Sequence, residues 1–288
     1  MKWALIRNAW RAIGRRNRTD VLARLFDQRF FGGLELAQLD PEVRWVINAA
    51  NVVSGVRFGF ERDVVGDYVS GLVSTQGTGL TLAQAAAASA AVPGAFAAWP
   101  LPDNVRLPCA GDIAPTVLDG GVYDNTGLEV LDGDTHRDVF TITMNAGGLL
   151  KPGRYGGVPL VRDLARANAL LYRQSTALRT RAMVDAFWRG KGIPLGNPLP
   201  KGARQGLLVA LATDQPKERT NPLERWMATH PERRKYHGED LSFVPTVFDR
   251  LDEELCRALV YRGWWLVGAA MAEYFPQLAP DTSTLSPP

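Results

Sequence analysis

Residues 116–125 read TVLDGGVYDN, and they predict more of the architecture than any other segment of the chain. Apolar and β-branched residues lead to Asp119, and Gly120 and Gly121 follow at once. This pattern indicates a buried strand that ends in a sharp turn, with a carboxylate at the rim of the sheet. A half-buried carboxylate in such a place can have the proton affinity that a general base needs. Because Asp-Gly is also a common turn dipeptide, a purely structural turn is the alternative interpretation.

Composition places the chain among ordinary globular proteins. Its 288 residues are 46% hydrophobic and 22% charged, and they can bury a large core. A formal charge of +3 is too small to indicate nucleic acid as a partner. The sequence has no run of about 18 apolar residues, and arginines interrupt the apolar residues near its start, so neither a membrane span nor a signal peptide is predicted. We therefore expect a cytoplasmic protein.

The first 29 residues have the pattern of a basic amphipathic helix. Its apolar face includes Trp3, Ile6 and Trp10, and the flanking arginines include Arg7 and Arg11. Such a helix can lie on an anionic membrane surface, which would make the protein peripherally membrane-associated. The alternative is that the apolar face packs on the body of this protein.

The body of the chain alternates between predicted strands and helices. Strands are expected over residues 44–53 (strongest over 45–47), 56–60, 116–119, 139–144 and 207–212. Helices are expected over residues 81–91, in a long segment with Leu164, Leu171 and Leu178 on its core face, and near the C-terminus. Residues 63–79 are expected to form a surface loop. This order predicts an α/β sheet with helices on its faces, formed by one domain over residues 30–275 and followed by a loose tail at 276–288.

Known binding motifs are not supported. The Gly77-Thr78-Gly79 sequence lacks the third glycine of a dinucleotide fingerprint, and no phosphate-binding loop occurs. A calcium-like acidic spacing over residues 132–138 lacks the required glycine, and the three histidines have no zinc-ligand spacing. No cofactor and no metal is therefore expected.

Three segments together resemble the patatin-like phospholipase family, especially its bacterial acyl hydrolases. They read VINAAN at 46–51 with a Ser-Gly pair after it, ASAAVPGAF at 88–96, and LDGGVYDN at 118–125. The resemblance covers most of the chain from about residue 30 to 275. It implies a three-layer α/β/α fold with a central, mostly parallel sheet. It also implies hydrolysis of a phospholipid or other acyl ester by a Ser-Asp dyad, with Asp119 as the acid and Gly120 and Gly121 completing its motif.

The sequence departs from this family at the nucleophile. No Gly-x-Ser-x-Gly occurs in the 288 residues, and no glycine-rich oxyanion loop precedes Trp45. The predicted positions of Ser54, Ser70, Ser74 and Ser89 do not lie on a strand-to-helix elbow, and Cys109 has no adjacent base. The fold is therefore expected to lack the family's N-terminal strand and nucleophile helix.

Three interpretations follow from this departure. The chain is the C-terminal part of a lipid acyl hydrolase, inactive alone; or it is a non-catalytic pseudoenzyme that binds a lipid, a membrane or a partner; or it is a decayed fragment with no stable function.

Overall fold

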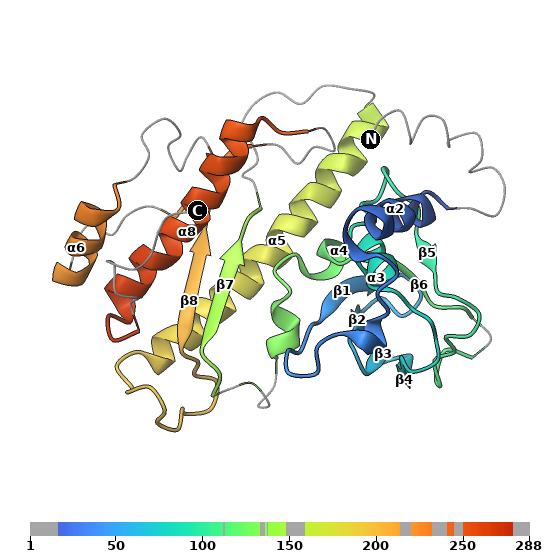
Figure 1. Ribbon diagram of the computed structural model, residues 1–288, viewed down its shortest axis with the longest axis horizontal. Helices are drawn as coiled ribbons and strands as arrows, with labels where there is room; N and C mark the ends of the chain where they lie inside the picture. Colours follow the sequence, from blue (N-terminus) through green and yellow to red (C-terminus); the bar gives the residue numbers. More distant parts are fainter. Residues whose placement is uncertain are drawn as a thin grey trace. The chain divides into compact units, whose positions relative to one another are not determined.

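The computed structural model describes residues 17–111, 113–132, 136, 138–147, 159–213, 220–231, 241–244 and 250–278. They belong to two compact units (Figure 1). The first comprises the chain up to residue 132 together with residues 163–178, and the second comprises residues 133–162 and 179 onward. Helix α5, Pro159–Gly190, contributes to both units. The predicted boundaries at residues 29 and 275 remain predictions.

The first unit is built on a six-stranded sheet in which every neighbouring pair is antiparallel. The spatial order is β4-β3-β2-β1-β6-β5. The strands are β1 Ile47–Asn51, β2 Arg57–Phe60, β3 Val64–Asp67, β4 Gly71–Ser74, β5 Trp99–Pro100 and β6 Thr116–Asp119. The mixed α/β class is confirmed, but the prediction of a mostly parallel sheet is wrong for this unit. The connections between β1, β2, β3 and β4 are too short for the crossover that parallel neighbours require.

Two strand predictions also need correction. Strand β1 begins at Ile47, and Trp45 before it is 54% exposed, so residues 45–47 are not the buried centre of the strand. Part of the predicted surface loop at 63–79 is instead the β3–β4 hairpin. Gly66 in β3 has φ +142, and a Cβ there would collide with the carbonyl of Gly71. A glycine is required because the two strands approach closely at this point.

Helix α3, Leu82–Ser89, begins as the sequence predicts and covers β1 and β6. The Thr81 hydroxyl accepts a hydrogen bond from the Gln84 amide (3.2 Å), and the Gln84 side chain accepts one from the Thr81 amide (2.9 Å). This reciprocal pair is a capping box, which satisfies two amides at the helix start. Ala83, Ala85, Ala87 and Ala88 are buried, so the thin helix can approach the sheet closely.

The sheet core lies between these strands, α3 and the surrounding loops. Phe58 and Phe60 are fully buried, with ring centroids 4.9 Å apart. The buried residues of this cluster are Leu36 from the 3-10 helix η3 (Leu36–Gln38), Ala49, Phe58, Phe60, Val65, Leu80, Ala85, Ala88, Trp99, Leu101, Val105, Leu107 and Val117. Burial on this scale, at roughly 25 cal/mol per Å² of apolar surface, is the main force that holds the unit together.

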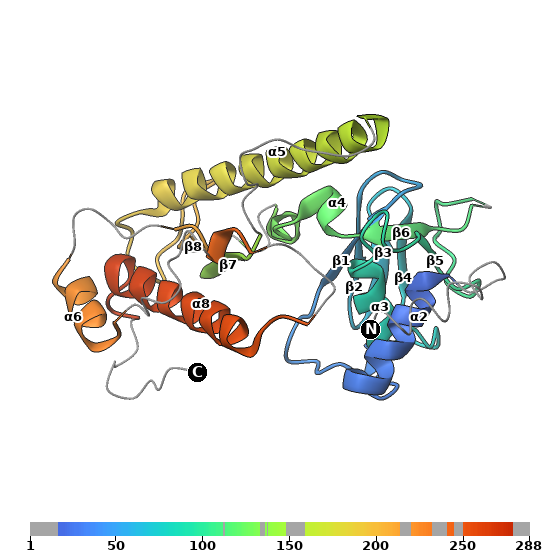
Figure 2. The ribbon, with the colours of Figure 1, turned by 90° about the horizontal axis from the view of Figure 1, so that it is seen from above.

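The N-terminal helical prediction is confirmed for the part that the structure describes. Helix α2, Arg18–Phe26, continues into the π-helical turn η2, Asp27–Phe31, and packs on α3 (Figures 1 and 2). The Asn17 side chain and Asp20 form a capping box at its start. The predicted membrane-facing residues Trp3, Ile6, Trp10, Arg7 and Arg11 lie outside the described residues, as does most of the tail at 276–288.

The second unit contains a parallel pair of strands, β7 Thr141–Asn145 and β8 Gly206–Ala210. Helices α6, Asn221–Thr229, and α8, Glu253–Tyr274, pack on each other, and α8 packs on β8. Their core is centred on Trp226 and Trp265, which are 1% and 2% exposed. Strand β7 is less buried than predicted, because Ile142 and Met144 are about half exposed.

Helix α5 is confirmed as a long helix, but its predicted core face is wrong. Leu164, Leu171 and Leu178 are 63%, 66% and 55% exposed. These residues lie at a spacing of seven, so they share one side of the helix.

Among the helices that the structure describes, none has the length and apolar composition to cross a bilayer.

Candidate functional site at the end of strand β6

Asp119 is the last residue of β6 and lies half buried at the rim of the six-stranded sheet. It is paired with Ala49 of the neighbouring strand β1. Helix α4, Gly121–Asp124, begins one residue later, after Gly120. The structure therefore confirms the local prediction of a strand, a sharp turn and a carboxylate at the rim.

The turn after Asp119 is held by the end of helix α3 and the residues that follow it. The Asp119 amide donates to the Ala91 carbonyl and the Gly120 amide donates to the Ser89 carbonyl, both at 3.2 Å. A Cβ at position 120 would collide with the carbonyl oxygen of Asn48 in β1. Gly120 has an ordinary helical φ of −60°, so glycine is needed there for space rather than for its backbone freedom.

These contacts bring together the three segments that carry the family resemblance. Residues 46–51 contain β1, residues 88–96 contain the end of α3, and residues 118–125 contain the end of β6 and α4. All three meet around Asp119, through its pairing with Ala49 and through the hydrogen bonds to Ser89 and Ala91. Segments separated in the sequence thus build one site, in which Asp119 is the central titratable group.

The Asp119 carboxylate has one hydrogen bond within the described part of the chain. The Gly121 amide donates to Oδ1 at 2.7 Å. Burial raises the pKa of Asp119 above its usual value, and the hydrogen bond from Gly121 opposes that rise. A carboxylate with a raised pKa and unused acceptor capacity can accept a proton from a reacting group.

Tyr172 of helix α5 is a neighbour that the sequence analysis missed. Its ring lies 3.2 Å from the position that a Cβ on Gly121 would take. Its pKa is raised, first by burial and then by the negative charge of Asp119. Below that pKa, the neutral phenol is a hydrogen-bond donor next to the acid. No sequence pattern links a tyrosine on a helix to an acid on a distant strand, so only the fold identifies this residue.

The acid that follows, Asp124, has a structural role. It is 4% exposed, and its carboxylate accepts hydrogen bonds from the Thr126 amide (3.0 Å), the Thr126 hydroxyl (2.6 Å) and the Glu129 amide (2.8 Å). These bonds close the loop between α4 and the 3-10 helix η4, Leu128–Leu131. With its acceptor positions used in this way, Asp124 fixes the loop and leaves Asp119 as the candidate for chemistry.

None of the four candidate serines lies on a turn from a strand into a helix. Ser54 lies in the β1–β2 turn and donates to Asp67 (Oγ to Oδ2, 3.2 Å). Ser70 is buried before β4, Ser74 ends β4, and Ser89 ends α3. A nucleophile elbow requires a strained turn that exposes the hydroxyl at a helix start. The expectation that these serines do not form the family's elbow is therefore confirmed.

The other reactive side chains offer no second centre in the described part of the chain. Cys109 is exposed and free, in the loop between β5 and β6. His230 is buried and stacked on Trp226 (ring centroids 4.1 Å apart), where it belongs to the core of the second unit. No group of three or more metal-ligating side chains occurs among the residues that the structure describes.

The geometry defines a mixed α/β protein with a half-buried acid at the end of an antiparallel strand. Comparison with known proteins found no matching family model, no matching curated protein and no matching solved structure.

Proposed function

We propose that this chain is the acid-bearing part of a patatin-like lipid acyl hydrolase, in which Asp119 serves a serine that the printed sequence does not contain. The supporting observation is the meeting of the three family-like segments at one half-buried carboxylate. A turn with a purely structural role would be expected to use the acceptor positions of its acid, as Asp124 does. Asp119 instead retains acceptor capacity beside Gly121 and Tyr172.

In the proposed reaction, Asp119 accepts the proton of the serine hydroxyl while the serine oxygen attacks the ester carbonyl carbon. The ester bond then breaks, and the leaving alcohol takes the proton from Asp119. Water repeats the sequence on the acyl-serine and releases the fatty acid. The substrate class is a phospholipid or another acyl ester, and the reaction requires neither a metal nor a cofactor.

The decisive experiment examines the coding DNA upstream of Met1 and the neighbouring reading frames. The proposal expects a Gly-x-Ser-x-Gly segment there, either in frame or in a separate polypeptide. When that segment is produced together with this chain, hydrolysis of medium-chain acyl esters should appear. Asp119→Asn should then lower kcat by about 10⁴-fold, since removing the acid of a serine catalytic group has effects of that size.

A matched control distinguishes the loss of the proposed catalytic acid from the loss of a negative charge elsewhere. Asp103→Asn removes an exposed acid from the loop between β5 and β6, and its activity should equal that of the parent. The printed chain alone should not turn over short acyl esters. Esterase activity of that chain that disappears in Asp119→Asn would contradict the absence of a nucleophile, and full activity of Asp119→Asn in the completed protein would refute the role of Asp119.

A non-catalytic role in binding lipid, membrane or a partner is the second candidate. The exposed leucines 164, 171 and 178 of α5 favour it, because an apolar helix face of this kind is usually covered in a functional assembly. Pelleting with anionic liposomes should then retain the protein, and removal of residues 1–16 should reduce binding if Trp3, Ile6, Trp10, Arg7 and Arg11 make the contact. Equal binding by both forms would remove this segment from the explanation.

A further inference from the structure

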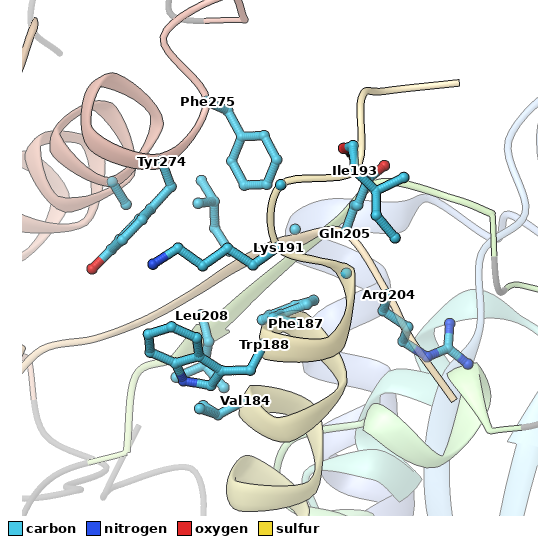
Figure 3. A pocket seen from close by; sticks show the side chains of 15 residues that line it. Val184, Phe187, Trp188, Lys191, Ile193, Arg204, Gln205, Leu208, Tyr274 and Phe275 are labelled. Atoms are coloured by element: carbon cyan, nitrogen blue, oxygen red, sulfur yellow. Dashed lines mark hydrogen bonds between the residues drawn. The ribbon is translucent and has the colours of Figure 1, made fainter. Parts of the chain in front are cut away.

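The second unit contains a cavity of about 240 Å³ that the proposed hydrolase function does not use (Figure 3). It is formed by the last turns of α5, the following connection, the start of β8 and the end of α8. The walls include Val184, Phe187 and Trp188 from α5, Leu208 from β8, and Tyr274 and Phe275 at the end of α8. The cavity is therefore mainly apolar and aromatic, as small-molecule sites commonly are.

Backbone contacts hold the walls of this cavity in place. The Arg204 amide donates to the Ala186 carbonyl at 2.9 Å, and a Cβ on Gly190 would collide with the carbonyl of Arg204. The Gln205 side-chain amide donates to the Ile193 carbonyl at 2.5 Å, so this polar group is already used by the protein. The connection between α5 and β8 is thus held against the end of α5, and the two together form one wall of the cavity.

Among the described residues that line this cavity, Lys191 is the cation best placed to contact a ligand. Its Nζ lies 4.4 Å from the centroid of the Trp188 ring, and in Figure 3 its side chain runs between Trp188 and Tyr274. Arg204 also lines the cavity, but its Nη1 donates to the His136 carbonyl at 2.7 Å and Figure 3 shows the guanidinium turned away from the other side chains. Among the described residues that line the cavity, none is acidic.

We propose that this cavity binds an amphipathic carboxylate with a chain of about eight carbons. The chain would lie among Phe187, Trp188 and Leu208, and the carboxylate would pair with Lys191. The chain length follows from the cavity volume of about 240 Å³. This volume corresponds to about eight groups of roughly 30 Å³, the volume of one water molecule, and a methylene group is about as large. An unbranched chain with a terminal carboxylate matches an apolar wall next to Lys191, whereas a polar ligand would leave its donors and acceptors without partners.

Isothermal titration of the whole chain with sodium octanoate tests this proposal. One saturable site is expected. Octanol has the same chain without the charge and should bind about tenfold more weakly, which corresponds to about 1.4 kcal/mol. Acetate has the charge without the chain and should not bind. No octanoate binding by folded protein would overturn the proposal.

Variants assign the site to this cavity. Lys191→Met should weaken octanoate about tenfold and leave octanol unchanged, whereas Lys201→Met removes the same charge elsewhere in the same connection and should change neither. Val184→Phe should abolish binding of both compounds, because the larger ring fills the cavity. Unchanged octanoate affinity in Lys191→Met would refute the assigned ion pair, even if Val184→Phe fails to fold.

The head group is tested by a third compound. Octyl phosphate has the same chain and a larger anionic group. Carboxylate specificity predicts weaker binding of octyl phosphate than of octanoate, and tighter binding would overturn the assignment in favour of a phosphate-bearing amphiphile. Because these measurements do not depend on ester hydrolysis or Asp119, their outcome is independent of the proposed enzymatic function.

Discussion

Asp67 and Asp119 each end a strand of the same antiparallel sheet, and they use their carboxylates differently. Asp67 is 4% exposed and accepts hydrogen bonds from Asn51 Nδ2 (2.8 Å), Ser54 Oγ (3.2 Å), the Val69 amide (2.9 Å) and the Ser70 amide (2.6 Å). Asp119 is half buried and, among the described residues, accepts one hydrogen bond, from the Gly121 amide. An acid with four donors holds a turn together, whereas an acid with one donor keeps the capacity to take a proton.

The same comparison explains why a Ser-Asp contact does not by itself indicate a catalytic dyad. Ser54 donates to Asp67, which resembles the pairing expected of nucleophile and base. However, Asp67 is buried in a network with Asn51 and Ser70, and Ser54 lies in a hairpin turn. The number and kind of donors around the acid distinguish the two sites better than the identity of the residue pair.

The largest loss of stability is expected from the substitution of Asp67, the structural acid. Asp67→Ala leaves four donors without their acceptor, and we expect the free energy of unfolding to fall by about 3–5 kcal/mol. Denaturant titration of the variant measures this loss. Asp63→Ala is the control, because that exposed acid forms a surface ion pair with Arg62 and should contribute only about 0–1 kcal/mol. Similar losses of stability in both variants would show that the hydrogen bonds of Asp67 contribute no more than a surface ion pair does.

A smaller loss is expected when the turn beside Asp119 is crowded. Gly120→Ala places a Cβ against the Asn48 carbonyl, which belongs to the backbone of β1 and cannot rotate away. Overpacking of this kind should cost about 1–3 kcal/mol, measured by thermal or chemical unfolding. Val122→Ala, at an exposed position of the same turn, should stay within about 0.5 kcal/mol. A neutral Gly120→Ala would mean that the turn relaxes without strain.

The charge of Asp119 should lower stability rather than support it. Burial raises the pKa of Asp119 in the folded state above its unfolded value of about 3.9. The stability that Asp119 contributes is therefore fully present below about pH 3.9, and it is lost as the pH rises through the folded-state pKa. Asp119→Asn keeps the shape and the acceptor for Gly121. We expect its stability relative to the parent to increase between about pH 4 and neutral pH. A relative decrease over that range would show that the fold stabilises the carboxylate anion.

The smallest expected effect is a change in the pKa of Tyr172. The pKa of Tyr172 is raised by burial first and by the charge of Asp119 second. Asp119→Asn should therefore lower the Tyr172 pKa toward the usual tyrosine value without reaching it, because the burial remains. Alkaline titration of tyrosinate absorbance, with Tyr172→Phe subtracted to isolate this residue, measures the shift. An unchanged Tyr172 pKa in Asp119→Asn would mean that the two groups do not interact.

Local features of the fold could be predicted where neighbouring residues alone decide them. The Thr81–Gln84 capping box, strand β2 and the turn after Asp119 all follow from residues within a few positions of one another. Predictions failed where distant segments decide the outcome. The leucines of α5 have the spacing of a core face and are exposed, because spacing does not show whether a partner element covers the helix.

The arrangement of the strands failed for a related reason. Alternation of strands and helices indicated an α/β sheet with helices on its faces, and the family resemblance implied that this sheet is mostly parallel. However, β3 and β4 lie in a segment that was predicted to be a surface loop. Gly66 and Asp67 were predicted to lie in the surface loop, but they end strand β3. The glycine is required because β3 approaches β4 closely at this point. Once that hairpin is present, the short connections make the neighbouring strands antiparallel.

The sequence by itself determined that a carboxylate follows a buried strand at position 119, that glycines come after it, and that no nucleophile elbow is encoded in the printed residues. Only the tertiary structure decided that residues 46–51 and 88–96 meet at this acid and that Tyr172 lies beside it. It also decided that Asp67, with the same position at a strand end, is structural. Backbone geometry and turns depend on neighbouring residues, whereas burial and hydrogen-bond partners, which set the pKa of an acid, come from segments that only folding brings together.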